Sequence, residues 1–349
     1  MQTQCNPIQM EFAEVERRRV VAAFDGGTVS SDGGALLLTR TDEAIGLIDR
    51  LAGCFRDRRA PALVEHAVRT LVGQRVFGIA AGYEDLNDHD ELRKDPLWGA
   101  LMGKLTAKRR DCQALAGKST LNRLEWAKAN GTTRYQRIEV DAPAIEALFV
   151  TLFLESYAKA PEEIVLDLDA TDDPLHGDQE GRFFHGYYDH YCYLPLYIFC
   201  GRHLLCAKLR PANIDGAAGA KEEVTRIVEQ IRARWPETRI ILRADSGFAR
   251  EGLMAWCEGN GVDYVFGLAR NRRLERWLQP TLERVAEQVA VRGQAAREFL
   301  ERSYRTLTSW SCARRVVGKA EVTTLGSNPR FVVTSLSVQA WDARALYED

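Results

Sequence analysis

The stretch I-V-L-D-L-D-A-T at residues 164–171 is the part of the sequence from which the fold can be worked out. Its apolar and polar residues alternate, so Leu166 and Leu168 fall on one face of a predicted β-strand. Asp167 and Asp169 fall on the other face, near the carboxyl end of the strand. Strands that are buried on both faces rarely carry acidic residues. Two carboxylates in this position therefore indicate a binding site at the end of the strand.

A second predicted strand ends in the same way. The run R-I-I-L-R-A-D at residues 239–245 places Asp245 directly after its aliphatic residues. Ligands of open α/β sheets bind at the carboxyl ends of the strands. We therefore expect the two strands to be parallel neighbours, with Asp169 and Asp245 close enough to hold a divalent metal ion through oxygen ligands. The competing interpretation is that Asp169 opens a turn with Thr171 and that Asp245 caps a helix starting near Gly247.

The composition is that of an ordinary globular protein with no overall preference for a charged partner. The chain has 349 residues, 46% of them hydrophobic and 28% charged, and a formal net charge of −2. A nucleic-acid partner would therefore have to be bound by local basic patches. The eight cysteines form no C-x-x-C pair, which argues against a zinc site of ordinary spacing and indicates reduced cysteines in a cytoplasmic protein. The sequence has no secretory signal and no apolar run of about 18 residues, so we expect no membrane as a partner.

The order of the predicted elements divides the chain into an arm and four further segments. From residue 159 the order is β-β-β-α-β-α-β, which is the element order of RNase H-like folds. We therefore expect an α/β protein with an RNase H-like core, a mixed sheet flanked by helices. The expected segments are a flexible arm at 1–20, a mainly helical DNA-binding N-terminal domain at 21–158, the core at 159–275, a β-rich insertion after the fifth core strand at 276–340 and the start of an incomplete helix at 341–349.

Two basic clusters are candidates for contact with nucleic acid. Lys and Arg side chains bind the phosphates of DNA and make the affinity strongly dependent on salt. The first cluster lies before residue 150, and the second directly follows the last predicted strand of the core. The candidate DNA-binding residues are Lys104, Lys108, Arg109, Arg110, Arg270, Arg272 and Arg273. As a bare run of charge, the first cluster is equally compatible with ordinary solvated surface.

Several motifs resemble those of the insertion-sequence DDE transposases, in particular the group named after insertion sequence thirteen-eighty. They are L-D-L-D-A-T-D-D-P at 166–174, Q-E-G at 179–181, Y-L-P-L at 193–196, L-R-P-A-N at 209–213 and R-A-D-S-G-F at 243–248. The run F-D-G-G-T-V-S-S-D-G-G-A-L-L-L at 24–38 is similar to the amino-terminal segment of the same group. The resemblance covers nearly the whole sequence.

By this resemblance, Asp169 and Asp245 match the first two catalytic acids of a DDE transposase. Asp167 faces the same way as Asp169 and would be an alternative metal ligand. The family implies two Mg²⁺ or Mn²⁺ ions, which clamp the attacking and leaving oxygens of a phosphoryl transfer. It also implies terminal inverted repeats and target DNA as partners, a homodimer within a synaptic complex, and a place in the bacterial cytoplasm at the nucleoid.

The resemblance predicts an enzyme that cuts DNA at the ends of an insertion sequence and joins the freed 3′ hydroxyl to target DNA. The third acid of the family is a glutamate on a helix after the β-rich insertion, and the sequence ends at 346–349, where this region begins. We therefore expect a truncated chain without its third acid and with little or no cleavage activity. Two alternatives remain open: a non-catalytic DNA-binding remnant of a transposase, and a metal-dependent nuclease of the same fold without strand transfer.

Overall fold

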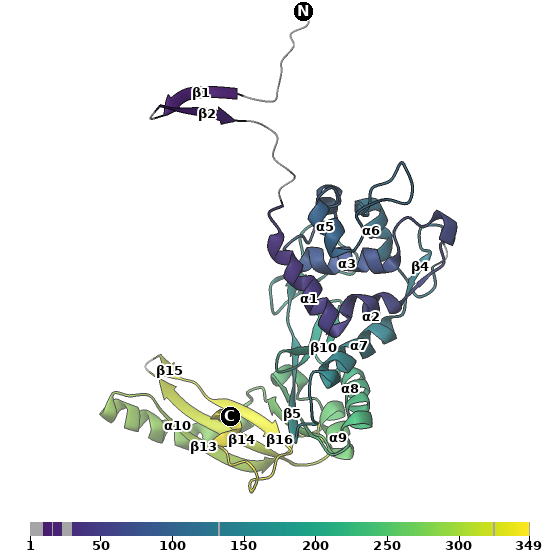
Figure 1. Ribbon diagram of the computed structural model, residues 1–349. Coiled ribbons are helices and arrows are strands. Elements are labelled where there is room, and N and C mark those ends of the chain that lie inside the picture. Colours follow the sequence, from purple (N-terminus) through teal and green to yellow (C-terminus); the bar gives the residue numbers. More distant parts are fainter. Residues whose placement is uncertain (1–9, 16, 23–29, 132, 324, 349) are drawn as a thin grey trace, which may run out of the picture. The chain divides into compact units, whose positions relative to one another are not determined.

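The computed structural model describes residues 10–15, 17–22, 30–131, 133–323 and 325–348 (Figure 1). The chain divides into two compact units, Met1–Ile145 and Glu146–Asp349. Each unit has its own hydrophobic core. No helix in the described part of the chain is long and apolar enough to cross a membrane.

The first unit consists mainly of short helices around a buried tryptophan. Trp98 is fully buried, and Leu71, Leu115 and Leu121 from other segments are buried in the same cluster. The elements of this unit are β1 (Met10–Val15), β2 (Arg18–Ala22), η1 (Gly33–Ala35), α1 (Leu36–Ile45), α2 (Leu47–Gly53), β3 (Phe55–Asp57), η2 (Pro61–Leu63), α3 (Val68–Ala80), η3 (Leu86–Asp88), α4 (His89–Leu92), α5 (Pro96–Leu101), α6 (Lys118–Glu125), β4 (Ile138–Val140) and the start of α7 (Ala142–Glu155).

The glycine-rich segment ahead of α1 is held by an aspartate. Asp32 accepts hydrogen bonds from the Tyr83 hydroxyl at 3.0 Å and from Trp98 Nε1 at 3.1 Å. The second bond satisfies the polar atom of the buried indole, which would cost free energy if it had no partner. This contact gives a structural role to the second D-G-G of the motif at 24–38, which begins at Asp32. The part of that motif up to residue 29 lies outside the described residues.

The N-terminal segment contains two paired strands. β1 and β2 pair as an antiparallel hairpin, with Phe12 opposite Val20 and Glu11 opposite Val21. The flexible arm at 1–20, expected from polar residues of mixed charge, stays a prediction. Residues 1–9 and 16 lie outside the described part of the chain.

The second unit is built on one nine-stranded mixed sheet. Its strands follow the order β10-β9-β5-β11-β12-β16-β14-β13, with β15 paired to β14. Strand β11 pairs in parallel with β5 on one side and with β12 on the other, and β9 and β10 continue the sheet beside β5 in antiparallel pairs. The strands are β5 (Glu163–Ala170), β9 (Leu196–Cys200), β10 (His203–Lys208), β11 (Arg239–Ala244), β12 (Asp263–Gly267), β13 (Ala296–Tyr304), β14 (Arg314–Thr323), β15 (Gly326–Ser327) and β16 (Arg330–Thr334).

Helices pack against the apolar face of this sheet. Leu166 of β5 and Leu242 of β11 belong to one buried cluster with Val150 of α7, Val224 of α8 and Met254 of α9. Helix α10 lies along β13 and β14 (Figure 1). The helices of this unit are the rest of α7, α8 (Ala220–Arg234), α9 (Glu251–Gly259), α10 (Arg272–Arg292) and α11 (Ala345–Glu348), with η4 (Ser246–Phe248) between β11 and α9.

The strands of the expected β-rich insertion continue the core sheet. β16 pairs with β12 in antiparallel fashion, and β14 and β13 follow it outward. Pairing with β16 covers the backbone groups that β12 would otherwise expose at an open sheet edge. A second difference lies after β5, where a small three-stranded sheet precedes β9. We call it the β6–β8 sheet; it consists of β6 (Asp173–Pro174), β7 (Phe183–His185) and β8 (His190–Tyr193).

Candidate active site

Strands β5 and β11 bring the two predicted acids to the same edge of the sheet. The strands pair in parallel, with Asp167 opposite Arg243 and Leu168 opposite Ala244. The next position on β5 is Asp169, and the next after β11 is Asp245; both residues are exposed. The prediction that the two strands are parallel neighbours is therefore confirmed.

The earlier part of this strand pair carries charges that are matched across the strands. Arg239 lies 3.2 Å from Glu163 of β5 and 2.8 Å from Asp263 of β12. Further along, Arg243 donates two hydrogen bonds to the Asp167 carboxylate, at 2.6 and 3.1 Å. Opposite charges that face each other across strands stabilise a sheet. These pairs explain why the polar face of β5 tolerates acidic residues along its length.

The position after the last paired residues differs, because Asp169 and Asp245 follow there and neither has a cationic partner among the described residues. The Asp169 side chain makes no hydrogen bond or ion pair with any other residue that the structure describes. Like charges that face each other across strands destabilise a sheet. A divalent cation between the carboxylates would replace this repulsion by attraction. The arrangement is therefore suited to bind a cation.

Asp245 also begins the short helical turn η4. Its Oδ1 atom accepts a hydrogen bond from the Gly247 amide at 2.8 Å. Asp245 is therefore a helix cap, as the competing interpretation expected, but only one of its carboxylate oxygens takes part in the cap. Oδ2 has no hydrogen-bond partner within the described part of the chain. The cap thus fixes the orientation of the carboxylate and leaves an oxygen for a ligand.

Asp167 has a different partner from the one that the sequence suggested. We expected it as an alternative metal ligand because it shares a face of β5 with Asp169. In the structure both of its carboxylate oxygens accept hydrogen bonds from Arg243. A metal ion would have to displace this bidentate guanidinium, which is a strong partner for a carboxylate. The geometry therefore favours Asp167 as an ion-pair partner over Asp167 as a metal ligand.

The β6–β8 sheet adds side chains that the sequence analysis did not select. Burial is the main cause of a raised pKa for Tyr188, and the negative charges of Asp172, Asp169 and Asp245 contribute to it. The Tyr188 phenol therefore lies within electrostatic reach of both acids. His190 Nε2 lies 2.8 Å from Asp172 Oδ2. The position of Asp172 shortly after Asp169 could have pointed to it, whereas the chain path that returns Tyr188 to this edge gives no sequence signal.

The chemistry of the two acids suits the oxygen ligands of a divalent metal ion. Among the described residues, no three His, Cys, Asp or Glu side chains gather into a set that could hold a metal ion. Mg²⁺ is commonly bound by one or two carboxylates, with water and substrate phosphates as its other ligands. Asp169 and Asp245 therefore fit the protein's share of the ligands for one ion. A second ion would need a further acid or oxygens from the substrate.

The first basic cluster lies in the first unit and is organised by a buried glutamate. Glu65 accepts hydrogen bonds from Lys104 Nζ at 2.8 Å and from the backbone amides of Lys108 and Arg109 at 2.9 and 3.0 Å. The bond from Lys104 is the main cause that lowers the pKa of the Glu65 carboxyl to about 2. Because its ammonium is bound to Glu65, Lys104 supports the loop. It is therefore not free to bind DNA, although the sequence predicted that it would.

The other cations of this cluster are exposed. The side chains of Lys108 and Arg110 make no ion pair with another described residue, and Arg109 lies 3.4 Å from Asp111. Arg109 and Arg110 line a hollow of about 660 Å³. Arg93 and Lys94 line it as well, although the sequence analysis did not select them. Part of the predicted cluster is thus exposed as expected, and two cations from another segment, Arg93 and Lys94, lie in the same hollow.

The second basic cluster follows β12, at the same edge of the sheet as the two acids. Arg270 and Arg272 are exposed and make no ion pair within the residues that the structure describes. Arg273 donates a hydrogen bond to the Arg305 carbonyl oxygen at 3.1 Å, and its guanidinium lies 4.9 Å from the centre of the Tyr304 ring. Arg270 and Arg272 are therefore the members of this cluster that remain available to a ligand.

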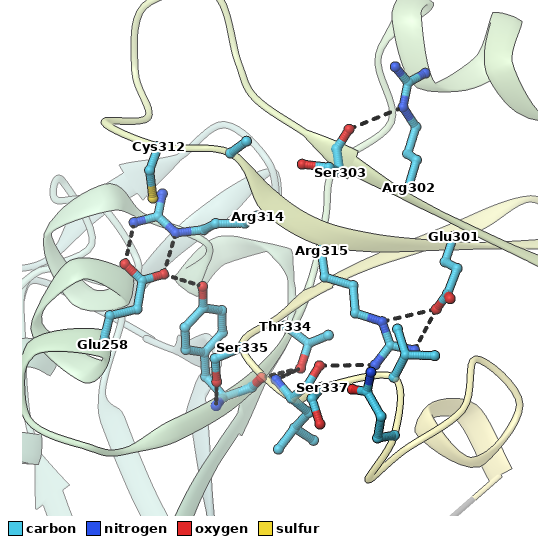
Figure 2. A pocket seen from close by; sticks show the side chains of 15 residues that line it. Glu258, Glu301, Arg302, Ser303, Cys312, Arg314, Arg315, Thr334, Ser335 and Ser337 are labelled. Carbon is cyan, nitrogen blue, oxygen red and sulfur yellow. Dashed lines mark hydrogen bonds and ion pairs between the residues drawn. The ribbon is translucent and has the colours of Figure 1, made fainter.

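A cavity of about 690 Å³ is lined by other residues than the two acids. Figure 2 shows the side chains that line it. It is lined by Tyr264 and Thr334 at the amino end of β12, whereas the acids lie at the carboxyl ends of the parallel strands. Figure 2 shows that Arg314 is paired with Glu258 on its wall. Because its most buried cation is already neutralised, this cavity is a weaker candidate for the chemistry than the exposed acids.

Comparison with known protein families identifies a match over nearly the whole chain. The family model described as transposase DDE domain group 1 matches residues 12–349. The matched region covers the first unit from residue 12 onward and the whole second unit, with Asp169 and Asp245. No curated protein sequence matches the chain.

Proposed function

The chain belongs to the transposase DDE domain family, group 1, and on this premise we propose that it is the transposase of an insertion sequence of the thirteen-eighty group. In this proposal it binds the terminal inverted repeats, cleaves DNA at the ends of the element and joins the freed 3′ hydroxyl to target DNA. Asp169 and Asp245 are its first two catalytic acids.

The observation that supports this proposal most directly is that the acids along β5 and β11 are paired with arginines, except for the two at the carboxyl end. Arg239 and Arg243 neutralise the acids of the earlier positions, and the last position has Asp169 and Asp245 alone. Random surface acids would not be expected to face each other where two parallel strands end. A ligand that carries positive charge accounts for the pair, and a divalent cation has the affinity for carboxylate oxygens that the pair requires.

In this proposal, the protein's own contribution is to hold the divalent ions and to orient the carboxylates that bind them. Divalent ions, when bound, stabilise the charge that develops in an in-line displacement at phosphorus and activate the attacking oxygen. Asp169 offers both carboxylate oxygens, and Asp245 offers Oδ2 while the Gly247 amide keeps Oδ1 in place. Arg243 neutralises Asp167, so the acids of β5 and β11 that remain free are the two at the edge.

The proposed fold of the core is RNase H-like. Strands β10, β9 and β5 are consecutive antiparallel neighbours, and β11 and β12 follow in parallel to β5 after one helix each. This arrangement supports the proposal, because the element order expected from the sequence leads to the same sheet. We also propose a homodimer within the synaptic complex and a location at the nucleoid in the bacterial cytoplasm, as the family resemblance implies.

The DNA contacts are proposed at the two basic clusters, each in its own unit. Lys108, Arg109 and Arg110 are the candidates in the first unit, and Arg270 and Arg272 are those in the second. Exposed Lys and Arg side chains release counterions from DNA when they bind its phosphates. We assign Lys104 the role of holding the first of these loops through Glu65.

Cleavage of a labelled duplex with a terminal repeat, in the presence of Mg²⁺ or Mn²⁺, tests the proposed function. Asp169→Asn and Asp245→Asn should abolish cleavage and preserve DNA binding, because each removes a metal-binding charge and no phosphate contact. Glu237→Gln, at an exposed acid just before β11, is the matched control and should leave cleavage unchanged.

Cleavage that survives both aspartate substitutions would contradict the assignment of the site. Cleavage without transfer of the 3′ hydroxyl to target DNA would favour the metal-dependent nuclease. Specific binding of the repeat without cleavage would favour the DNA-binding remnant. Robust cleavage would make Asp172, which with both acids acts on the pKa of Tyr188, the first residue to examine as a further acid.

The salt dependence of DNA binding tests the first basic cluster. Replacement of Lys108, Arg109 and Arg110 by alanine should weaken binding and flatten the slope of log K against log salt by about 0.9 for each phosphate that the variant no longer binds. Lys128→Ala, an exposed lysine elsewhere in the first unit, is the control and should keep the slope. An unchanged slope in the triple variant would show that the cluster is ordinary solvated surface.

A further inference from the structure

Gly267 is the last residue of β12 and lies beside Asp245. Strands β11 and β12 pair in parallel, with Arg243 opposite Val265 and Ala244 opposite Phe266. The next position along both strands places Gly267 next to Asp245. Three parallel strands therefore end in the series Asp169, Asp245 and Gly267. The sequence pattern points to the first two and gives no signal for the glycine.

The space beside Gly267 is filled by the backbone that carries Asp245. A Cβ atom on Gly267 would lie 2.8 Å from the amide nitrogen of Ser246, 3.1 Å from the carbonyl carbon of Asp245 and 3.4 Å from its Cα. All three are backbone atoms, which cannot rotate away as the end of a side chain can. Gly267 does not have a positive φ angle. The requirement for glycine therefore comes from close approach of two chain segments and not from an unusual backbone conformation.

The strand that carries Gly267 is held from its other side. Gly267 is opposite Val332 of β16, and the amide of Leu268 donates a hydrogen bond to the Phe331 carbonyl oxygen at 2.8 Å. Phe266, directly before the glycine, is fully buried. Interiors are close-packed, so β12 has little freedom to move away from a new side chain. The displacement would therefore fall on the peptide between Asp245 and Ser246.

We propose that Gly267 is a positioning residue for the Asp245 carboxylate. This inference rests on the proposed function, because it concerns the placement of one of the two metal-binding acids. The absence of a side chain lets the chain leave β11 across the end of β12, so that Asp245 stays beside Asp169. The hydrogen bond from the Gly247 amide then sets the direction of the carboxylate. A side chain at residue 267 would move the acid and leave the rest of the sheet intact.

Binding of Mn²⁺ alone to the full chain, measured by electron paramagnetic resonance and calorimetry, tests this role. Gly267→Ala should bind Mn²⁺ about 10- to 100-fold more weakly, the usual loss when a group that orients a metal ligand is changed. Gly252→Ala is the matched control, because Gly252 is exposed in α9 and a Cβ atom on it would have no neighbouring atom within 4 Å. It should bind Mn²⁺ as the parent does.

Val265→Ala separates lost positioning from lost stability. Val265 is on the same strand, two residues before Gly267; it is half-buried, and its truncation removes apolar contacts without approaching Asp245. We expect it to lower the thermal midpoint and to keep the Mn²⁺ affinity. Gly267→Ala should lower the affinity even when its thermal midpoint is no lower than that of Val265→Ala.

Asp245→Asn distinguishes failure of this inference from failure of the proposed function. If Asp245→Asn weakens Mn²⁺ binding and Gly267→Ala does not, the positioning role of Gly267 is overturned and the metal site stands. If Asp245→Asn leaves Mn²⁺ binding unchanged, the proposed site and the role of Gly267 are both overturned. A Gly267→Ala chain that no longer folds would also overturn the inference, because it would make the close approach a requirement of the fold as a whole.

Discussion

The two ends of the parallel strands in the second unit differ in how their acidic residues are partnered. At the amino end, Arg239 and Arg314 each contact two carboxylates. At the carboxyl end, Asp169 and Asp245 lie side by side, and no arginine or lysine pairs with either among the described residues. The amino-end pairs are Arg239 with Glu163 and Asp263, and Arg314 with Glu251 and Glu258.

This difference separates charges that stabilise the fold from charges that are available to a ligand. A buried or half-buried carboxylate is unfavourable unless a cation or hydrogen-bond donors compensate it. The amino end meets this condition internally. The carboxyl end does not, and its two acids stay exposed to water, where an external cation can reach them. The unpaired like charges beside the paired positions of β5 and β11 therefore support the proposed site at the carboxyl end.

The largest effect on stability is expected at the paired end. Arg314→Met should lower the free energy of unfolding by about 2–3 kcal/mol, somewhat less than loss of one partner of a fully buried pair, since Glu251 and Glu258 are partly exposed. Binding of Mn²⁺ should stay within twofold of the parent. Urea unfolding and Mn²⁺ titration measure the two effects. Arg302→Met, at an exposed arginine of the same cavity, is the control; an equal loss of stability there would show that the pairing is not the cause.

The paired end should also lose stability in acid, to a smaller extent. Hydrogen bonds from Arg314 are the main cause that lowers the pKa of both Glu251 and Glu258 below the ordinary value of 4.5. The unfolded chain therefore takes up these protons first, so the stabilisation is complete above pH 4.5 and is lost as the pH falls below it. Calorimetric midpoints between about pH 6 and pH 3.5 should fall less steeply in Arg314→Met than in the parent. Parallel curves would contradict this assignment of the acid-sensitive charges.

The smallest effects on stability are expected at Asp167 and Asp169, where a paired acid and an unpaired acid lie two residues apart on β5. Asp167→Asn removes a half-exposed ion pair with Arg243 and should cost less than about 1 kcal/mol of stability. Asp169→Asn removes a like-charge contact and should raise stability by a few tenths of a kcal/mol, within the ~0.2–1 kcal/mol of such cross-strand pairs. Urea unfolding without metal ions measures both. A loss of stability in Asp169→Asn, or a gain in Asp167→Asn, would reverse the distinction drawn between the two acids.

Local sequence pattern was sufficient for the elements of the core. The alternation at 164–169 and the run at 239–244 correspond to β5 and β11, because a strand has one side-chain period and few ways to bury its aliphatic face. The order of strands and helices after residue 159 also led to parallel β5 and β11, and hence to two acids at one edge. The family resemblance agreed with these residues and pointed to the same pair.

Only the tertiary structure decided which charges are free. Lys104 and Asp167 carry the expected charges, but Glu65 and Arg243 bind them, and no local pattern connects residues so far apart in the chain. The continuation of the sheet through β16 and the close approach of Gly267 to Asp245 have the same origin. Sequence periodicity determines which face a side chain occupies within its own element. The identity of its neighbour depends on how separate elements pack, because pairing partners and close contacts are chosen by the whole fold.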